Sequence, residues 1–248
     1  MKKLTALVLS VGMIFSIAAC SSSKVNDKAL DTLESSIQKF AELKSASYSI
    51  AMDVEADKEK ANLKLYGDFI ATTAKPEISA TLDMEASGEK VEKYMQIFLK
   101  DDTVYMNMLG LTKQKTSLNK MMGNTPMPEI GFDSDTFKLN KDDMKPYLKE
   151  ASIKGNDLKL VLNTTKINEE ANKNETTSKA KIEFKTFDMD VTLKDGFMEK
   201  AVITMDMKGA STGSEIQEVK GTITLEFKNI NNIKEIAYPD FKDYKEEK

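Results

Sequence analysis

The sequence predicts an α+β protein built on a long, curved antiparallel sheet of about 9–11 strands, an open half-barrel. Three observations lead to this class. Apolar residues first recur at helical spacing and then alternate with polar residues in many short runs. Between two sets of such runs lies a segment, residues 110–150, that is rich in Gly, Pro and Met. An N-terminal helix and this helical or irregular insert are therefore expected to cover the sheet.

The first twenty residues read as a secretory signal and not as part of the fold. Two lysines precede an apolar stretch, residues 4–17, which is shorter than the about 20 apolar residues that span a bilayer. The sequence Ile17-Ala18-Ala19-Cys20 then resembles the bacterial lipoprotein box. In that family a peptidase cuts between Ala19 and Cys20 and the thiol receives a diacylglycerol, so the resemblance implies that Cys20 is a lipid anchor. The alternative is an ordinary signal peptide that happens to contain a Cys.

The chain divides into four parts on this interpretation. Residues 1–19 are the signal peptide, 20–25 a short lipidated tether, 26–241 a single domain, and 242–248 a polar tail. The tether beyond the Cys extends at most about 17 Å. We therefore expect the domain to lie against the extracytoplasmic face of the cell membrane. All 36 basic residues are Lys, which is compatible with an AT-rich, Gram-positive source.

The domain is expected to begin with a helix over residues 27–43. Apolar side chains recur there every three or four residues, in a stripe made by Leu30, Leu33, Ile37 and Phe40. Asn26 is suited to the N-cap, and Asp27 to the positive end of the helix. The helix therefore has one apolar face to bury.

The period changes to two from residue 47 onward. Apolar and polar residues alternate over residues 48–54, 61–65, 78–84, 95–99 and 104–108. Turn residues separate the runs, among them Ser87-Gly88 and Asp101-Asp102. This pattern is typical of half-buried antiparallel strands with one apolar face.

The second half of the domain repeats this pattern after the insert. A short helix is expected near Asp142-Asp143, with Pro146 in its first turn. Strands are expected around residues 158–162, 187–193, 203–207 and 219–227, with a hairpin turn at Asp195-Gly196. The polar stretch 166–181 is expected to be a solvated loop or an exposed helix, and a shorter apolar segment, 233–238, ends at Pro239.

The composition argues against most kinds of catalysis. The chain has no His, one Cys and no Trp, so it lacks Ser-His and Cys-His pairs and imidazole metal sites. The net charge is −4 at pH 7, which does not favour nucleic acid as a partner. Asp133-Ser134-Asp135 and Asp188-Met189-Asp190 lack the spacing of a calcium loop. We expect no enzyme activity, no cofactor and no metal.

One apolar face on a long sheet raises the question of what covers it. Two helices leave part of a concave sheet uncovered, and the remaining space is suited to an acyl chain. The candidate cavity lining is Ile50, Met52, Leu63, Leu82, Met84, Met95, Met106 and Met205. The candidate lid, residues 118–132, contains Met121, Met122 and Met127. A well-filled core is the alternative, because Met also fills irregular cores.

The order of these elements resembles that of a known group of proteins. A lipobox, an amphipathic helix, a long meander, an insert and a second meander are followed by Phe227-Lys228-Asn229, Ile233, Ile236 and Pro239. This layout is similar to that of the LolA/LppX-type lipoproteins and periplasmic carriers, over about residues 25–240. The resemblance implies a half-barrel lidded by helices, a hydrophobic cavity for lipids or lipidated molecules, and no catalytic residues. The chain departs from the carriers in having no Arg near the cavity.

Two functions remain open at this point. The first is a membrane-anchored lipoprotein that binds or carries a hydrophobic ligand. The second is a protein-interaction or envelope-sensing lipoprotein with a filled core, whose protein partner is unknown.

Overall fold

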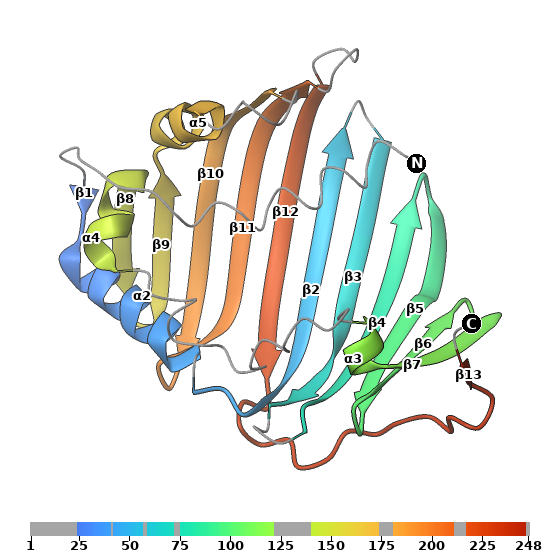
Figure 1. Ribbon diagram of the computed structural model, residues 1–248. Coiled ribbons are helices and arrows are strands. Elements are labelled where there is room, and N and C mark those ends of the chain that lie inside the picture. Colours follow the sequence, from blue (N-terminus) through green and yellow to red (C-terminus); the bar gives the residue numbers. More distant parts are fainter. Residues whose placement is uncertain are drawn as a thin grey trace.

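The computed structural model describes residues 24–40, 42–56, 59–71, 75–121, 140–173, 181–210 and 217–246. These residues form one curved sheet of 13 strands that does not close, with few helices (Figure 1). The expected α+β half-barrel is confirmed. The helices are α2 (Asp27–Phe40), α3 (Leu118–Met121), α4 (Lys141–Met144), the 3-10 turn η2 (Lys145–Tyr147) and α5 (Thr164–Lys173).

The strands form two meanders that lie side by side. The first consists of β2 (Ser45–Ala56), β3 (Glu59–Ile70), β4 (Glu77–Ala86), β5 (Glu89–Lys100), β6 (Thr103–Met108) and β7 (Thr112–Ser117). The second consists of β8 (Leu148–Lys154), β9 (Asp157–Leu162), β10 (Lys181–Lys194), β11 (Phe197–Ala210) and β12 (Gln217–Lys228). Antiparallel pairing of β12 with β2 joins the meanders in the middle of the sheet.

Two very short strands pair in parallel with the outer strands. β1 (Lys24–Val25) pairs with β8, and β13 (Lys245–Glu246) pairs with β7. The expected polar tail, residues 242–248, thus contacts the sheet, and Tyr244 within this tail is buried. These pairings, together with β7 and β8, raise the number of strands above the expected range.

Apart from the additional strands, the elements follow the residue pattern closely, with four differences. Pro146 lies in η2, after the short helix α4 and not in the first turn of that helix. The first helix ends at Phe40 and not at residue 43. The polar stretch after residue 163 begins as helix α5, whose Ile167 is buried. The segment 233–238 forms no strand, although its Ile236 is buried.

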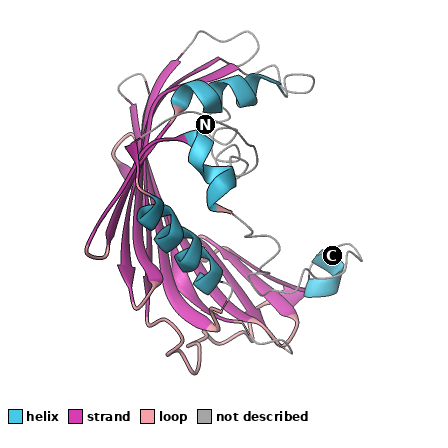
Figure 2. Ribbon diagram, turned by 90° about the vertical axis from the view of Figure 1, so that its left-hand side faces the viewer, coloured by secondary structure: helices cyan, strands magenta, loops and turns pink. Residues whose placement is uncertain are grey.

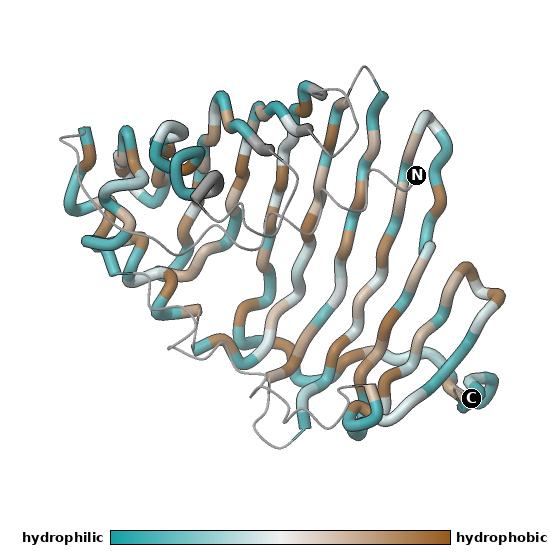
Figure 3. Tube along the Cα trace, turned by 45° about the horizontal axis from the view of Figure 1, so that its top comes forward, coloured by the Kyte–Doolittle hydropathy of each residue, from teal (hydrophilic) through white to brown (hydrophobic). Residues whose placement is uncertain are grey.

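Cross-strand pairing aligns most of the apolar residues of the sheet on one face. Hydrophobic and hydrophilic residues alternate along the strands (Figure 3). One row crosses ten neighbouring strands through Ile153, Leu158, Val191, Ala201, Leu225, Ile50, Leu65, Leu82, Met95 and Met108. This register places the polar residues that alternate with them along each strand on the opposite face.

Figure 2 shows the two longer helices on the concave side of the sheet. They pack there on its apolar face. From α2, Leu30 and Leu33 pack with residues of β8 to β11, among them the fully buried Val191. From α5, Ile167 packs with Phe184, Phe187, Met205, Met207, Val219 and Ile223. This half of the apolar face therefore has a packed core.

The opposite side of β5 and β6 is covered by residues 236–246, which we call the C-terminal strap. Phe241 stacks on Tyr105 with ring centroids 3.8 Å apart and also contacts Phe98. The Tyr238 hydroxyl lies 2.9 Å from the Leu99 carbonyl and 3.0 Å from a Glu77 carboxylate oxygen. A small aromatic core thus lies on the side that the alternation pattern assigned to solvent.

Candidate ligand-binding face

The apolar face of β2 to β6, which we call the open half, holds seven of the eight residues proposed to line a cavity. They are Ile50, Met52, Leu63, Leu82, Met84, Met95 and Met106, and all are only partly buried. Direct pairs between neighbouring strands bring them together, for example Met52 with Leu63 and Leu63 with Met84. The structure therefore gathers these residues into one patch.

The open half differs from the rest of the apolar face in what packs on it. Within the described residues, the main helix–strand packing joins α2 to β8 and β11, α5 to β10, and α3 to β7. Met205, the eighth predicted residue, lies under α5 and is only 4% exposed. It belongs to the packed core, against which Ile50 and Met52 of the open half also pack.

Along the middle of the described strands the inward-facing residues of the open half are uncharged, and the register places Glu59 and Glu89 on this face only at the strand ends. Asp53, Glu55 and Lys64 alternate with the uncharged residues and so face the other way. Tyr48 brings a hydroxyl to the apolar face, and this group donates to the Ser79 carbonyl at 3.0 Å. Burial, together with the charge of Asp68, raises the pKa of Tyr48 to about 12. This surface is therefore suited to apolar contact and offers no group for acid–base chemistry near neutral pH.

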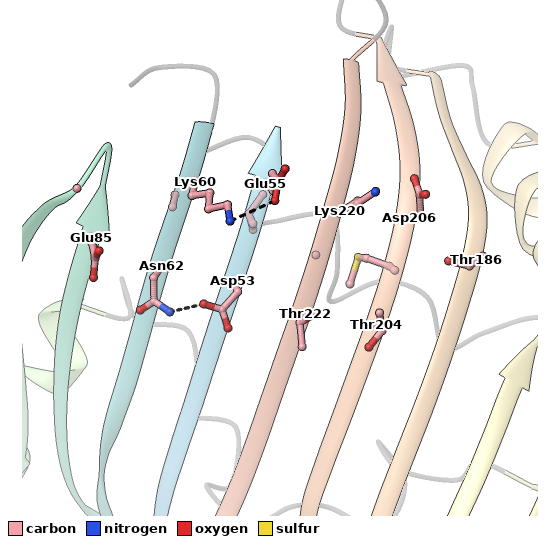
Figure 4. Close-up of a pocket in the computed structure, with 15 residues that line it drawn as sticks. Asp53, Glu55, Lys60, Asn62, Glu85, Thr186, Thr204, Asp206, Lys220 and Thr222 are labelled. Carbon is pink, nitrogen blue, oxygen red and sulfur yellow. Dashed lines mark hydrogen bonds and ion pairs between the residues drawn. The ribbon is translucent and has the colours of Figure 1, made fainter. Parts of the chain in front are cut away.

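A polar hollow of about 660 Å³ lies on the opposite face of the sheet. Figure 4 shows side chains of β3, β2, β12, β11 and β10 around it, including Asp53, Asp206, Lys220 and Thr222. Lys60 lies 3.7 Å from Glu55, and Asn62 donates to Asp53. Sequence reasoning assigned these residues to a solvated face, and nothing in their alternation signals a hollow. The charged and polar side chains among its walls distinguish it from the apolar cavity that the sequence predicts.

Several predicted site residues lie outside the described part of the chain. These are Ala19 and Cys20 of the lipobox and Met122 and Met127 of the candidate lid. Met121 is described, ends helix α3 and is 57% exposed. The anchor and the lid stay predictions.

The described residues show neither a membrane-spanning helix nor a cluster of metal ligands. None of their helices is both long and apolar enough to cross a bilayer. They also contain no group of three Asp, Glu, Cys or His side chains placed to hold a metal ion.

Comparisons with known proteins find similar solved structures but no similar sequence. No family model and no curated protein matches the sequence. The crystal structure of LprF from Mycobacterium bovis matches with 8% identity and a TM-score of 0.46, over 88% of this chain and 99% of that one. The Mycobacterium tuberculosis lipoprotein LppX matches with 9% identity and a TM-score of 0.41, over 86% and 100%. At this level of similarity, function has to be argued from the residues of the chain itself.

Proposed function

We propose that the protein is a membrane-anchored extracytoplasmic lipoprotein that binds or carries a hydrophobic ligand, a lipid or a lipidated molecule, on the open half of its sheet. One observation carries this proposal. One apolar row crosses ten strands without interruption, whereas the longer described helices pack on the β8 to β11 half. Away from the buried cluster around Leu99 and Leu118, the apolar residues of β2 to β5, such as Ile50, Leu82 and Met95, are thus only partly buried.

The energetics of apolar surface support a ligand there. Each Å² of apolar surface removed from water is worth about 25 cal/mol, and soluble monomers rarely expose large contiguous apolar patches. An acyl chain laid across the strands would contact Ile50, Leu63 and Leu82 in turn. The Met side chains at 52, 84 and 95 would adapt to chains of different shape, because Met is flexible and polarizable.

The rest of the proposal concerns the lipid anchor and the lid. Cys20 would hold the protein on the membrane through its diacylglycerol, since two acyl chains give stable attachment. Residues 118–132, with Met121, Met122 and Met127, would act as a lid over the open half. No cofactor, metal or catalytic group enters this mechanism.

A protein-interaction or envelope-sensing lipoprotein is the second candidate. The packed cores under α2 and α5 favour it, because they fill one half of the apolar face without a ligand. If the open half is filled by the chain itself in the same way, the protein acts through its outer surface.

Native mass spectrometry of the mature chain, purified from membranes and followed by organic extraction, separates the two functions. We expect a noncovalent adduct that extracts as a lipid. A bare mass that stays unchanged after incubation with lipids would contradict the carrier function and favour the second candidate.

A matched pair of variants locates the ligand on the sheet. Leu82 faces the open half, and its neighbour Thr81 faces the other side of the same strand. We expect Leu82→Gln to weaken binding of a fluorescent fatty acid about tenfold, the equivalent of about 1.4 kcal/mol. Thr81→Gln should leave binding unchanged. Equal effects of the two substitutions would place the ligand elsewhere.

A further inference from the structure

The turn between β6 and β7 is the most exposed apolar part of the described structure. Residues 108–111, Met-Leu-Gly-Leu, form this turn, and we call them the hairpin tip. Met108 and Leu109 are each 45% exposed, and Leu111 is 85% exposed. Three large apolar side chains therefore reach water within four residues.

The backbone of the hairpin tip makes this composition more unusual. Four hairpin turns place two consecutive residues at positive φ, namely Ser87-Gly88, Asp101-Asp102, Leu109-Gly110 and Asp195-Gly196. Asp adopts this conformation more easily than Leu, and Asn-Gly is the preferred pair there. A polar residue at position 109 would suit both the backbone and the solvent. Folding alone therefore does not account for Leu109.

Hydrogen bonds hold the hairpin tip in a fixed shape. The Leu109 amide donates to the Tyr94 carbonyl at 3.1 Å, and the Leu111 amide donates to the Met108 carbonyl at 3.0 Å. The apolar side chains are thus presented on an ordered turn, which lowers the entropy lost when they bind.

The charges around the hairpin tip are compatible with a lipid surface. Residues 103–121 contain no Asp or Glu, in a chain whose net charge is −4. Their lysines include Lys113 and Lys115, which lie 3.6 Å from Asp243 and 3.5 Å from Glu246 of the C-terminal strap. Among the described residues, the carboxylates paired with these two lysines thus come from the strap and not from the hairpin itself.

The neighbouring sheet edge argues against an extended peptide as the partner. β5 continues past the end of β6, so residues 89–94 lie beyond its last pair, Met95 with Met108. This stretch carries the Lys90–Glu92 ion pair and an irregularity in register. Lys93 has φ 51° and its amide donates to Asp83. Charges and bulges of this kind protect edges from strand addition.

We infer that the hairpin tip inserts into the surface of the membrane, as a second contact beside the lipid on Cys20. This inference rests on the proposed lipid anchor. β1 fixes Lys24 opposite Glu150, so only Ser21, Ser22 and Ser23 separate the anchor from the sheet. That link spans about 14 Å, which keeps the protein at the bilayer.

The two contacts lie near opposite ends of the strand order of the sheet. β1 borders β8 at one end of the strand order, and the hairpin tip joins β6 to β7 at the other end. The half-barrel is thereby supported on both sides, and the open half lies next to the hairpin tip, where Met108 pairs with Met95. A lipid could then pass from the bilayer to the open half along an apolar surface.

Site-directed labelling of the whole mature protein tests this inference. When Cys20 is acylated, Leu111→Cys provides the only free thiol in the chain. This thiol is labelled with an environment-sensitive fluorophore. The matched control is Ser87→Cys, in the polar turn between β4 and β5. In vesicles of phosphatidylcholine and phosphatidylglycerol, we expect nitroxide lipids to quench the label at 111 and iodide to be excluded from it. The label at 87 should show the reverse.

Each other outcome overturns the inference in a distinguishable way. If the acylated protein is on the vesicles but both labels are equally open to iodide, the hairpin tip does not insert, whereas the proposed anchor stands. Shielding at 111 that needs added membrane proteins would make the partner a protein. If the mature protein isolated from cell membranes proves to carry no acyl groups on Cys20, both the inference and the proposed anchor would be contradicted.

Substitutions in the hairpin tip separate insertion from folding. We expect Leu109→Asn to raise the melting temperature, because Asn tolerates positive φ, and yet to reduce the quenching of the label at 111 by nitroxide lipids. Leu109→Met should keep the quenching. A Leu109→Asn protein that is quenched as fully as the parent would overturn the inference.

Discussion

The hydroxyl of Tyr48 on β2 donates a hydrogen bond of 3.0 Å to the backbone carbonyl of Ser79 on β4, two strands away. The intervening residue on β3 is Gly67, which pairs directly with Tyr48. Because Gly67 has no side chain, the Tyr48 ring can cross β3 at this point. The contact ties three strands of the open half together, and two predictions concern it.

Replacing Gly67 by Ala should destabilise the protein. A Cβ at this position would overlap the Ser79 backbone carbonyl, which cannot move without disturbing the pairing of β3 with β4. We expect a loss of about 2–3 kcal/mol in the free energy of unfolding, measured with urea. Gly209→Ala is the control, since a Cβ there meets nothing within 4 Å. Similar losses from both substitutions would show that the close approach at Gly67 is unimportant.

The alkaline stability of the protein should depend on Tyr48. Burial raises the pKa of Tyr48 to about 12, above its value in the unfolded chain. The folded state thus keeps the phenol proton longer, and its contribution is complete below about pH 10 and is lost between about pH 10 and 12. We expect Tyr48→Phe to flatten the decline in stability over this interval by about 1–2 kcal/mol, after allowance for partial exposure. An unchanged decline would mean that Tyr48 ionises as freely as in water.

The C-terminal strap should contribute to stability through its aromatic contacts. Phe241 stacks on Tyr105 and meets the Tyr244 ring edge-on, with centroids 5.4 Å apart. We expect Phe241→Ala to cost about 2–3 kcal/mol in urea unfolding. Lys242→Ala, which removes an exposed ion pair with Asp240, should cost less than about 0.5 kcal/mol. If the two substitutions cost the same, the strap is not held by its rings.

The location of the protein should depend on Cys20. Cys20→Ser removes the thiol that lipidation requires, so we expect the protein to move from the membrane fraction to the soluble extracytoplasmic fraction. Cell fractionation with detection by antibody measures this, and Ser21→Ala serves as the control that keeps the thiol. Retention of Cys20→Ser on the membrane would show that the lipid is not the main anchor.

The strands that the sequence predicts are those whose two faces differ in polarity. β2, β4 and β12 alternate clearly, because one face meets apolar partners and the other meets water. β7 was missed because its residues Thr112–Ser117 are all polar, and its pairing with β6 decides its structure. Local pattern cannot reveal a strand that is held by backbone pairing alone.

Other features depend on contacts between distant parts of the chain. The pairing of β12 with β2 sets the strand order, and no local signal in either strand specifies the partner. The C-terminal strap was expected to be a polar tail from residue 242, although Tyr244 is buried against Tyr105. Its burial depends on an aromatic surface formed by β5 and β6.

The candidate site could be predicted only in part, because alternation determines the face on which a residue lies but not what covers that face. Alternation is sufficient to place Ile50, Leu63 and Leu82 on one face, because side chains in a strand have a fixed period of two. Met205 has the same period, but α5 covers it, and periodicity does not show which helix covers which strand. The exposed hairpin tip carries no periodic signal at all.

The two meanders meet at a seam, the pairing of β2 with β12, and this seam affects how the chain folds. Within each meander most neighbouring strands are joined by a few residues, although the segment with helix α5 separates β9 from β10, so most of their contacts are local and form quickly. Ala56 and Val219, in contrast, meet across the seam although about two thirds of the chain separates them. Closing so long a loop costs entropy that is recovered only when the central strands pair. The meanders are therefore expected to form early as separate units, with the rate of folding set by the late meeting of β2 and β12.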